Sequence, residues 1–326
     1  MSLDSDVIVD RRRMRRKLTF WRVLAAAVAI AAIAAIATTL SPRGRSAFAT
    51  AGSIARVTIN GLIRSDQGRV EALERLENSN TAAVVVHINS PGGTTAGSEQ
   101  LYDSLMRLKA KKPLVVVVEG LAASGGYIAA IASDHIVAQQ SSLVGSIGVL
   151  FQYPNFAELM KTIGVKVEQV KSSPLKAAPN GFEPTSPEAR AALDALVKDS
   201  YAWFRNLVKQ RRGMDDELLE KVADGRVFTG RQAVELKLVD QLGDERTAVS
   251  WLVEQKNVKK DLPVRDYSLT PRFSDLTFLR TAGSVTLDAL GLSGLARHLG
   301  QAATTQAIDR FSLDGMLALW QPSGSD

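Results

Sequence analysis

The chain has no cysteine among its 326 residues and only three histidines. The lack of cysteine excludes disulfides, thiolate nucleophiles and zinc sites built on thiolates. Charged residues make up 23% of the chain and hydrophobic residues 45%. These proportions are ordinary for a globular protein and exclude a largely disordered chain. The length allows one large domain or two medium ones.

The scarcity of histidine narrows the choice of a catalytic base. His87 and His135 lie in apolar runs typical of strands, and His298 lies in a weakly patterned region. None of them stands in a loop with an obvious carboxylate partner, as a Ser-His-Asp triad requires. A histidine base is therefore the lesser alternative, and both strand histidines are interpreted as structural.

Positive charge is concentrated at the start of the chain. Residues 1–22 hold seven Lys or Arg and three Asp, and an uncharged apolar run follows at residues 23–40. A basic cluster alone would suit a nucleic acid. A basic cluster before an apolar run that is just long enough to cross a bilayer as a helix indicates a membrane anchor instead. We therefore predict no nucleic-acid partner, a cytoplasmic segment at 1–22 and a transmembrane helix at 23–40.

The alternative is a cleaved secretory signal with its cleavage site at 47–49. Either interpretation exports the rest of the chain. Residues 41–53, rich in Ser, Ala, Gly and Arg, are predicted to be a linker, and residues 54–260 to form the folded domain. Residues 261–326 form an extension of unclear role with weak periodicity, in which 287–299 and 307–319 are candidate amphipathic helices.

Apolar runs typical of strands alternate with helical patterns through the folded domain. This alternation predicts an α/β fold of repeated βαβ units, with a parallel sheet covered on both faces. The expected strands are 55–59, 83–88, 114–118, 135–138, 144–149 and 165–170. The expected helices are 67–77, 96–108, 126–133, 156–163, 187–211, 215–223 and 230–236.

A serine lies where one of these strands turns into a helix. Ser124 stands among small residues after the run 114–118 and opens the next helical stretch. Such a turn exposes a nucleophile, and free backbone N–H groups there can hold an oxyanion. Gly125, next to the serine, and Gly93, in the turn after an earlier strand, are the candidate donors. Alternatively, these glycines only permit tight turns.

A serine hydroxyl reacts only when a neighbouring base takes its proton, and a lysine can be that base if burial lowers its pKa. Lys166, Lys171 and Lys176 all lie near the expected edge of the site. Spacing alone does not choose among them. The chain therefore reads as a serine hydrolase whose base is an amine.

Four motifs, in this order after an N-terminal anchor, resemble the signal peptide peptidase A family. They are Asn89–Gly93, Ala122–Tyr127, Val144–Gly148 and Ala223–Ala233, and the resemblance spans residues 54–245. Members of this family are serine peptidases with a Ser–Lys dyad on a ClpP/crotonase-like fold. The resemblance therefore implies that fold and that activity for this chain.

The resemblance also assigns roles to residues. It implies that Ser124 is the nucleophile, that Lys176 is the base and that Ser146 hydrogen-bonds and orients the lysine. It implies that Gly93 and Gly125 supply the oxyanion donors.

The same resemblance favours Lys176 over Lys171 as the base. One departure is that Ser172–Leu175 precedes the lysine where the family more often has Ser-Gly. This difference leaves the local shape of that loop open.

For the whole protein, the resemblance implies homo-oligomeric rings in which neighbouring protomers share the dyad. It implies apolar peptide substrates, such as remnant signal peptides. It also implies a single-pass protein of the bacterial inner membrane, with residues 23–40 in lipid and the peptidase domain on the periplasmic side. No cofactor and no metal are expected. The alternatives are an acyl-thioester enzyme of the crotonase kind and a non-catalytic membrane scaffold of the same fold.

Overall fold

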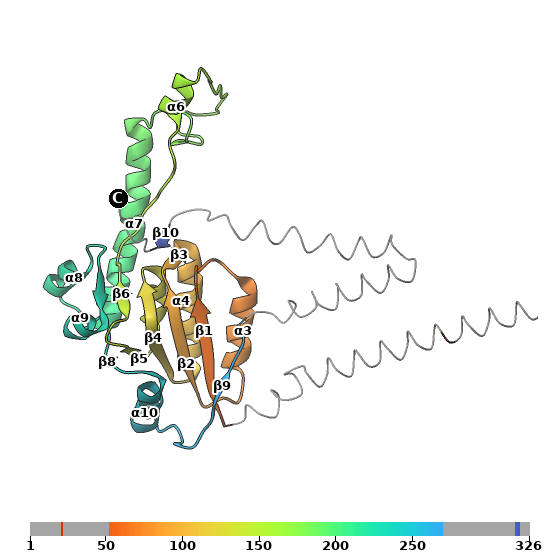
Figure 1. The fold of residues 1–326 in the computed structure, drawn as a ribbon, viewed down its shortest axis with the longest axis vertical. Coiled ribbons are helices and arrows are strands. Elements are labelled where there is room, and N and C mark those ends of the chain that lie inside the picture. Colours follow the sequence, from red (N-terminus) through yellow and green to blue (C-terminus); the bar gives the residue numbers. More distant parts are fainter. Residues whose placement is uncertain (1–20, 22–51, 270–316, 320–326) are drawn as a thin grey trace, which may run out of the picture. The chain divides into compact units, whose positions relative to one another are not determined.

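The computed structural model describes Trp21, residues 52–269 and residues 317–319 (Figure 1). The chain divides into two units, residues 1–51 and residues 52–326. The expected anchor at 23–40 and the candidate helix at 287–299 lie outside the described residues. Within the part of the chain that is described, no helix is long and apolar enough to cross a membrane.

A mostly parallel sheet forms the centre of the second unit (Figure 1). Its strands run in the order β7-β6-β4-β2-β1-β9, with β5 also paired to β4 and β8 to β5. All of these pairs are parallel except β6 with β7. The α/β fold is therefore confirmed, with a mixed sheet. The strands are β1 (Ile54–Asn60), β2 (Ala83–Ser90), β4 (Leu114–Ala123), β5 (His135–Ala138), β6 (Leu143–Gly145), β7 (Val227–Thr229), β8 (Gln241–Leu242) and β9 (Val264–Asp266).

Both faces of the sheet are buried, which explains the continuous valine runs of β2 and β4. Successive side chains of a strand point to opposite faces. Val84 and Val86 join the core beneath helices α3 (Gln67–Glu77) and α4 (Thr95–Lys111), whereas Val85 packs in a second core with α10 (Glu245–Lys256). The helix α10 was not predicted from the sequence.

A long helix, α7 (Pro187–Arg212), runs past the sheet, and its ends carry standard capping residues. The Ser186 hydroxyl accepts a hydrogen bond from the Ala189 N–H, and Pro187 stands at the first helical position. Gly213 ends the helix in the left-handed conformation. The helix expected over 187–211 is thus confirmed to within one residue. The shorter helices nearby are α5 (Gly125–Ala130), α8 (Asp216–Val222) and α9 (Gly230–Glu235).

Residues 151–186, here named the arm, stand away from the sheet beside the first half of α7 (Figure 1). The arm contains helix α6 (Ala157–Thr162), and none of its residues is buried. The strand expected over 165–170 is wrong, because those residues pair with no neighbour. Val165 and Val167 are instead 48% and 42% exposed.

Two short strands after the end of the expected folded domain return to it. The strand β9 pairs with β1. The strand β10 (Leu317–Leu319) pairs antiparallel with β3 (Gly92–Thr94). The helix expected over 307–319 is therefore wrong at 317–319, and the rest of that range lies outside the described residues.

Candidate functional site

Ser124 forms the turn between β4 and α5. The strand ends at Ala123 and the helix begins at Gly125, so the serine joins them directly. Its backbone has φ 54° and ψ −116°, and its residue is only 1% exposed. A residue other than glycine adopts this conformation only when the surrounding structure holds it there, and such residues concentrate at functional sites.

Hydrogen bonds hold this turn from both sides. The Ser124 N–H donates to the Gly145 carbonyl at 2.8 Å, and the Ser124 carbonyl accepts from the N–H groups of Tyr127 and Ile128. The Tyr127 hydroxyl donates to the Leu238 carbonyl at 2.8 Å. Complete burial raises the pKa of Tyr127, so this hydroxyl keeps its proton and remains a donor.

The glycine-rich turn after β2 packs against the start of α5. A Cβ atom at Gly126 would lie 2.7 Å from the Ser90 carbonyl oxygen, so only glycine allows this approach. The Ile63 N–H donates to the Gly92 carbonyl, and the Ile63 carbonyl accepts from the Thr94 N–H. These two hydrogen bonds occupy one edge of β3. The Gly93 N–H therefore points to the other edge, where β10 lies. The two glycine-rich turns thus meet, as the sheet topology predicts.

The loop that carries Ser146 lies next to Ser124. The Ser124 hydroxyl faces the Gly148 carbonyl at 3.5 Å, which is a long hydrogen bond. The Ser146 N–H donates to the Arg226 carbonyl at 2.8 Å. Ser146 is 7% exposed, and its hydroxyl has no hydrogen-bond partner among the described residues. A nearly buried hydroxyl is therefore available close to Ser124.

Lys176 lies elsewhere, on the exposed arm (Figure 1). Its backbone N–H donates to the Ser173 carbonyl. Its amine contacts neither an acceptor nor a carboxylate among the residues that the structure describes. A single chain therefore does not bring Lys176 to Ser124.

The other two lysines are already paired. Lys171 forms an ion pair with Glu183, and this ammonium holds the pKa of the Glu183 carboxyl below its usual range. Lys166 pairs with Glu168 at 2.9 Å. Of the three lysine candidates, Lys176 is the one whose amine has no partner within the described part of the chain.

The two described histidines lie in strands of the sheet, and neither contacts Ser124. His87 lies 2.8 Å from Glu245 and 3.2 Å from Glu119, and the sequence did not reveal either partner. His135 stacks on Trp251 with ring centres 4.6 Å apart. His298 lies outside the described residues. In the described ranges, no three His, Asp or Glu side chains gather as metal ligands would.

Comparison with known proteins assigns the chain to a family. Residues 106–259 match the model of peptidase family S49, and residues 59–142 match that of the Clp proteases. "Putative protease slr0021" from Synechocystis sp. is 37% identical over 204 residues, which are 62% of this chain and 74% of that protein. The chain belongs to peptidase family S49. This S49 chain is a serine peptidase with a ClpP-like α/β fold.

Other relatives carry related names. "Putative signal peptide peptidase SppA" of Enterococcus faecium is 30% identical over 230 residues, which are 66% of each protein. "Serine protease SPPA, chloroplastic" of Arabidopsis thaliana is 30% identical over 213 residues, 64% of this S49 chain and 32% of the plant protein. The match thus spans about a third of the plant relative. Among solved structures, ClpP1 from Listeria monocytogenes aligns with 59% of this chain and 93% of its own, at 16% identity and a TM-score of 0.38.

Proposed function

We propose that this S49 peptidase is a membrane-anchored endopeptidase that cleaves apolar peptides with a Ser–Lys dyad. Ser124 is the nucleophile and Lys176 the base. The observation that carries the proposal is the turn at Ser124. It is held in a strained conformation between the glycine-rich turn at Gly93 and the Ser146 loop.

The chemistry follows from the groups around that turn. The neutral amine of Lys176 takes the Ser124 proton as Oγ attacks a peptide carbonyl carbon. The N–H groups of Gly93 and Gly125 hold the oxyanion. The lysine then gives the proton to the leaving amine as the C–N bond breaks. Water, deprotonated by the same lysine, releases the acyl group from Ser124.

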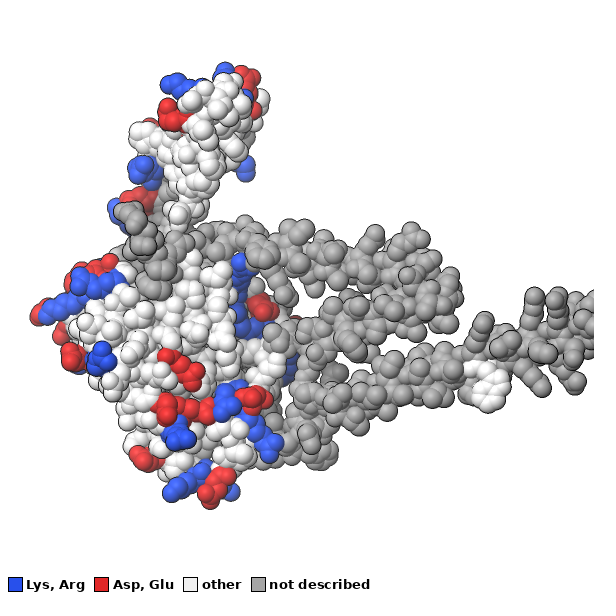
Figure 2. Space-filling model, in the orientation of Figure 1, with Lys and Arg blue, Asp and Glu red and all other residues white. Residues whose placement is uncertain are grey.

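The lysine is supplied by a neighbouring protomer. A lysine amine is neutral near pH 7 only where burial or nearby positive charge lowers its pKa, and the arm of a single chain buries none of its residues. The arm nevertheless carries large apolar side chains, and the face drawn in Figure 2 is mostly uncharged along it. A second copy packed over the arm would cover these side chains, as in a ring. They are Phe151, Phe156, Leu159, Ile163, Val165, Val167, Val170, Leu175 and Phe182.

The substrates are apolar peptides such as remnant signal peptides. The edge of β3 that carries the Gly93 N–H accepts an extended strand, since β10 pairs with it in antiparallel register. The segment 23–40 holds the peptidase in the bacterial inner membrane, with the catalytic domain on the periplasmic side. Tethering to the membrane raises the effective concentration of substrates left in it.

Cleavage by mixed oligomers of the full-length protein in detergent tests the shared dyad. We expect Ser124→Ala and Lys176→Ala each to abolish cleavage of an apolar peptide, and Lys171→Ala to retain it. Oligomers re-formed from a mixture of the two inactive variants regain part of the activity, because some sites combine an intact serine with an intact lysine. Peptidase activity in either variant alone would contradict the assigned roles. If the mixture regains no activity, the serine and the lysine of a site belong to the same chain.

The alternatives give different results with the same preparation. A non-catalytic scaffold of this fold leaves the assembled wild type without peptidase activity. An enzyme of the crotonase kind hydrolyses an acyl-CoA thioester in preference to the peptide. A reporter that is active only in the cytoplasm can be fused to the C-terminus. A signal from this fusion would contradict the proposed periplasmic location.

A further inference from the structure

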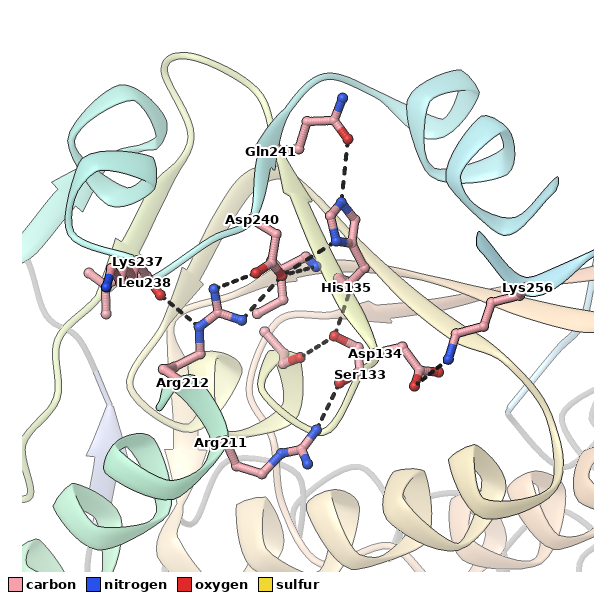
Figure 3. A network of polar contacts seen from close by, with 12 residues as sticks. Ser133, Asp134, His135, Arg211, Arg212, Lys237, Leu238, Asp240, Gln241 and Lys256 are labelled. Atoms are coloured by element: carbon pink, nitrogen blue, oxygen red, sulfur yellow. Dashed lines mark hydrogen bonds and ion pairs between the residues drawn. The ribbon is translucent and has the colours of Figure 1, made fainter. Parts of the chain in front are cut away.

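One side chain of α7 binds the backbone at the C-terminal end of α5, the helix that follows Ser124. The Arg211 guanidinium donates from Nε to the Ile131 carbonyl at 2.7 Å and from Nη2 to the Ser133 carbonyl at 2.8 Å. Nη2 also lies 3.4 Å from the Ala132 carbonyl. Figure 3 shows Arg211 reaching Ser133 in this way. These carbonyls directly follow α5, where Arg211 contacts three of them and Lys109 also donates to the Ser133 carbonyl at 3.2 Å. Arg211 is thus the cation that joins α7 to the backbone at this end of the helix.

The helix between Arg211 and Ser124 is short and rigidly enclosed. All six residues of α5, Gly125–Ala130, are buried. At about 1.5 Å per residue, six residues span only about 9 Å, and a displacement of one end moves the other. Ser124 at its first end has no side-chain cap and a strained backbone, so its position depends on how the helix is held.

The same α7 continues from the arm. It begins at Pro187, directly after the residues that carry Lys176. Its buried residues Phe204 and Val208 pack in the same core as Ile128 of α5. Arg211 adds directional hydrogen bonds to this apolar contact. The helix that supports the arm is thus connected to the helix that supports the nucleophile.

We propose that Arg211 is a positioning residue for the peptidase reaction. It fixes Ser124, through α5, relative to the helix that carries the arm. The proposal rests on the proposed role of Ser124 as nucleophile. Arginine suits this task better than lysine, because its planar fork contacts several carbonyls at once whereas an ammonium acts as a single point of charge.

A comparison of variants in the full-length, assembled protein tests this role. Arg211→Met removes the donors and keeps the stem, and Arg211→Lys keeps the charge without the fork. Lys209→Met is the matched control on the same turn of α7, because Lys209 pairs with Asp216 at the start of α8 and does not reach α5. Three quantities are measured on the oligomeric fraction from gel filtration, well below the melting temperature. They are kcat, KM and the rate at which a fluorophosphonate probe labels Ser124.

We expect Arg211→Met to lower kcat and the labelling rate by about 10- to 100-fold while KM is unchanged. Arg211→Lys recovers part of the loss, and Lys209→Met behaves as wild type. Wild-type kcat and labelling in Arg211→Met would overturn this inference alone, and so would an equal loss in Lys209→Met. If the wild type itself is not labelled at Ser124, the proposed function fails and this inference with it.

Discussion

The backbone N–H of Ser124 donates a hydrogen bond of 2.8 Å to the carbonyl oxygen of Gly145. This bond joins the turn that carries Ser124, the proposed nucleophile, to the loop that carries Ser146. The Ser146 hydroxyl has no partner within the described part of the chain, although the residue is almost buried. This hydroxyl is therefore free to accept the hydrogen bond that we propose for it with Lys176 in the assembled site.

Ser146→Ala is therefore expected to lower kcat by about 10-fold or more with little change in melting temperature, since it removes the hydrogen bond proposed to orient Lys176 and no bond within the described chain. Ser142→Ala is the matched contrast. The Ser142 hydroxyl donates to the Val118 carbonyl at 2.6 Å and is fully engaged. Its loss should reduce the free energy of unfolding by about 1 kcal/mol and leave kcat unchanged. Kinetics combined with thermal melts separate the two results.

Gly93→Ala tests how closely β3 approaches its neighbour. A Cβ atom there would lie 1.7 Å from the Ile63 carbonyl oxygen, so the backbone must shift. We expect a loss of about 2 kcal/mol or more in the free energy of unfolding, together with a loss of peptidase activity. Gly148→Ala places its Cβ 3.6 Å from Gly225, an ordinary contact, and serves as the control for stability. Equal denaturation midpoints for the two variants would contradict the close approach.

The pairing of β10 with β3 predicts competition with substrate. Residues 317–319 cover the edge of β3 to which an extended peptide would bind. A chain that ends at residue 316 should therefore show a lower KM for an apolar peptide, whereas a chain that ends at residue 319 keeps β10 and should behave as the full chain. Steady-state kinetics measure both. An unchanged KM in the shorter chain would show that substrate does not use this edge.

The ion pair between Glu245 and Arg56 makes the stability of the fold depend on pH. Arg56 donates to both carboxylate oxygens of Glu245, at 2.5 and 2.6 Å, and holds the pKa of this carboxyl below its usual range, with a further contribution from His87. The unfolded chain takes up this proton at a higher pH than the folded one. The resulting stability is therefore present above the pKa of the unfolded carboxyl, about 4.3, and is lost as the pH falls through the folded pKa.

Glu245→Gln removes this contribution. We expect a lower free energy of unfolding at neutral pH and a shallower decline on acidification from about pH 5 downward, measured by urea unfolding. Glu74→Gln is the control, because Glu74 is exposed and its carboxylate has no ion-pair partner among the described residues. A parallel pH dependence in the wild type and Glu245→Gln would contradict the prediction.

The turn at Ser124 was predictable because its signals are local. A valine run followed by small residues indicates a buried strand and then a closely packed helix. The end of the strand was not predictable. β4 continues from Val118 to Ala123, because Leu121 and its neighbours pair with β6, and the residues of β6 lie some distance along the chain.

The arm shows where sequence patterns mislead. Val165 and Val167 have the period of a strand, yet no neighbouring strand is present and their side chains stay exposed. The family resemblance favoured Lys176 over Lys171, but the sequence did not reveal that Glu183 pairs with Lys171. Both the exposure of these valines and the pairing of Lys171 depend on tertiary contacts.

The absence of any buried residue in the arm has a consequence for the cell. Under the proposed shared dyad, a newly made protomer carries Ser124 but must meet another copy before the amine of Lys176 can act. Proteolytic capacity then rises more steeply than the amount of chain synthesised, and dilution switches it off without a propeptide. On the same proposal, polypeptides near an isolated protomer stay uncut until enough copies have gathered.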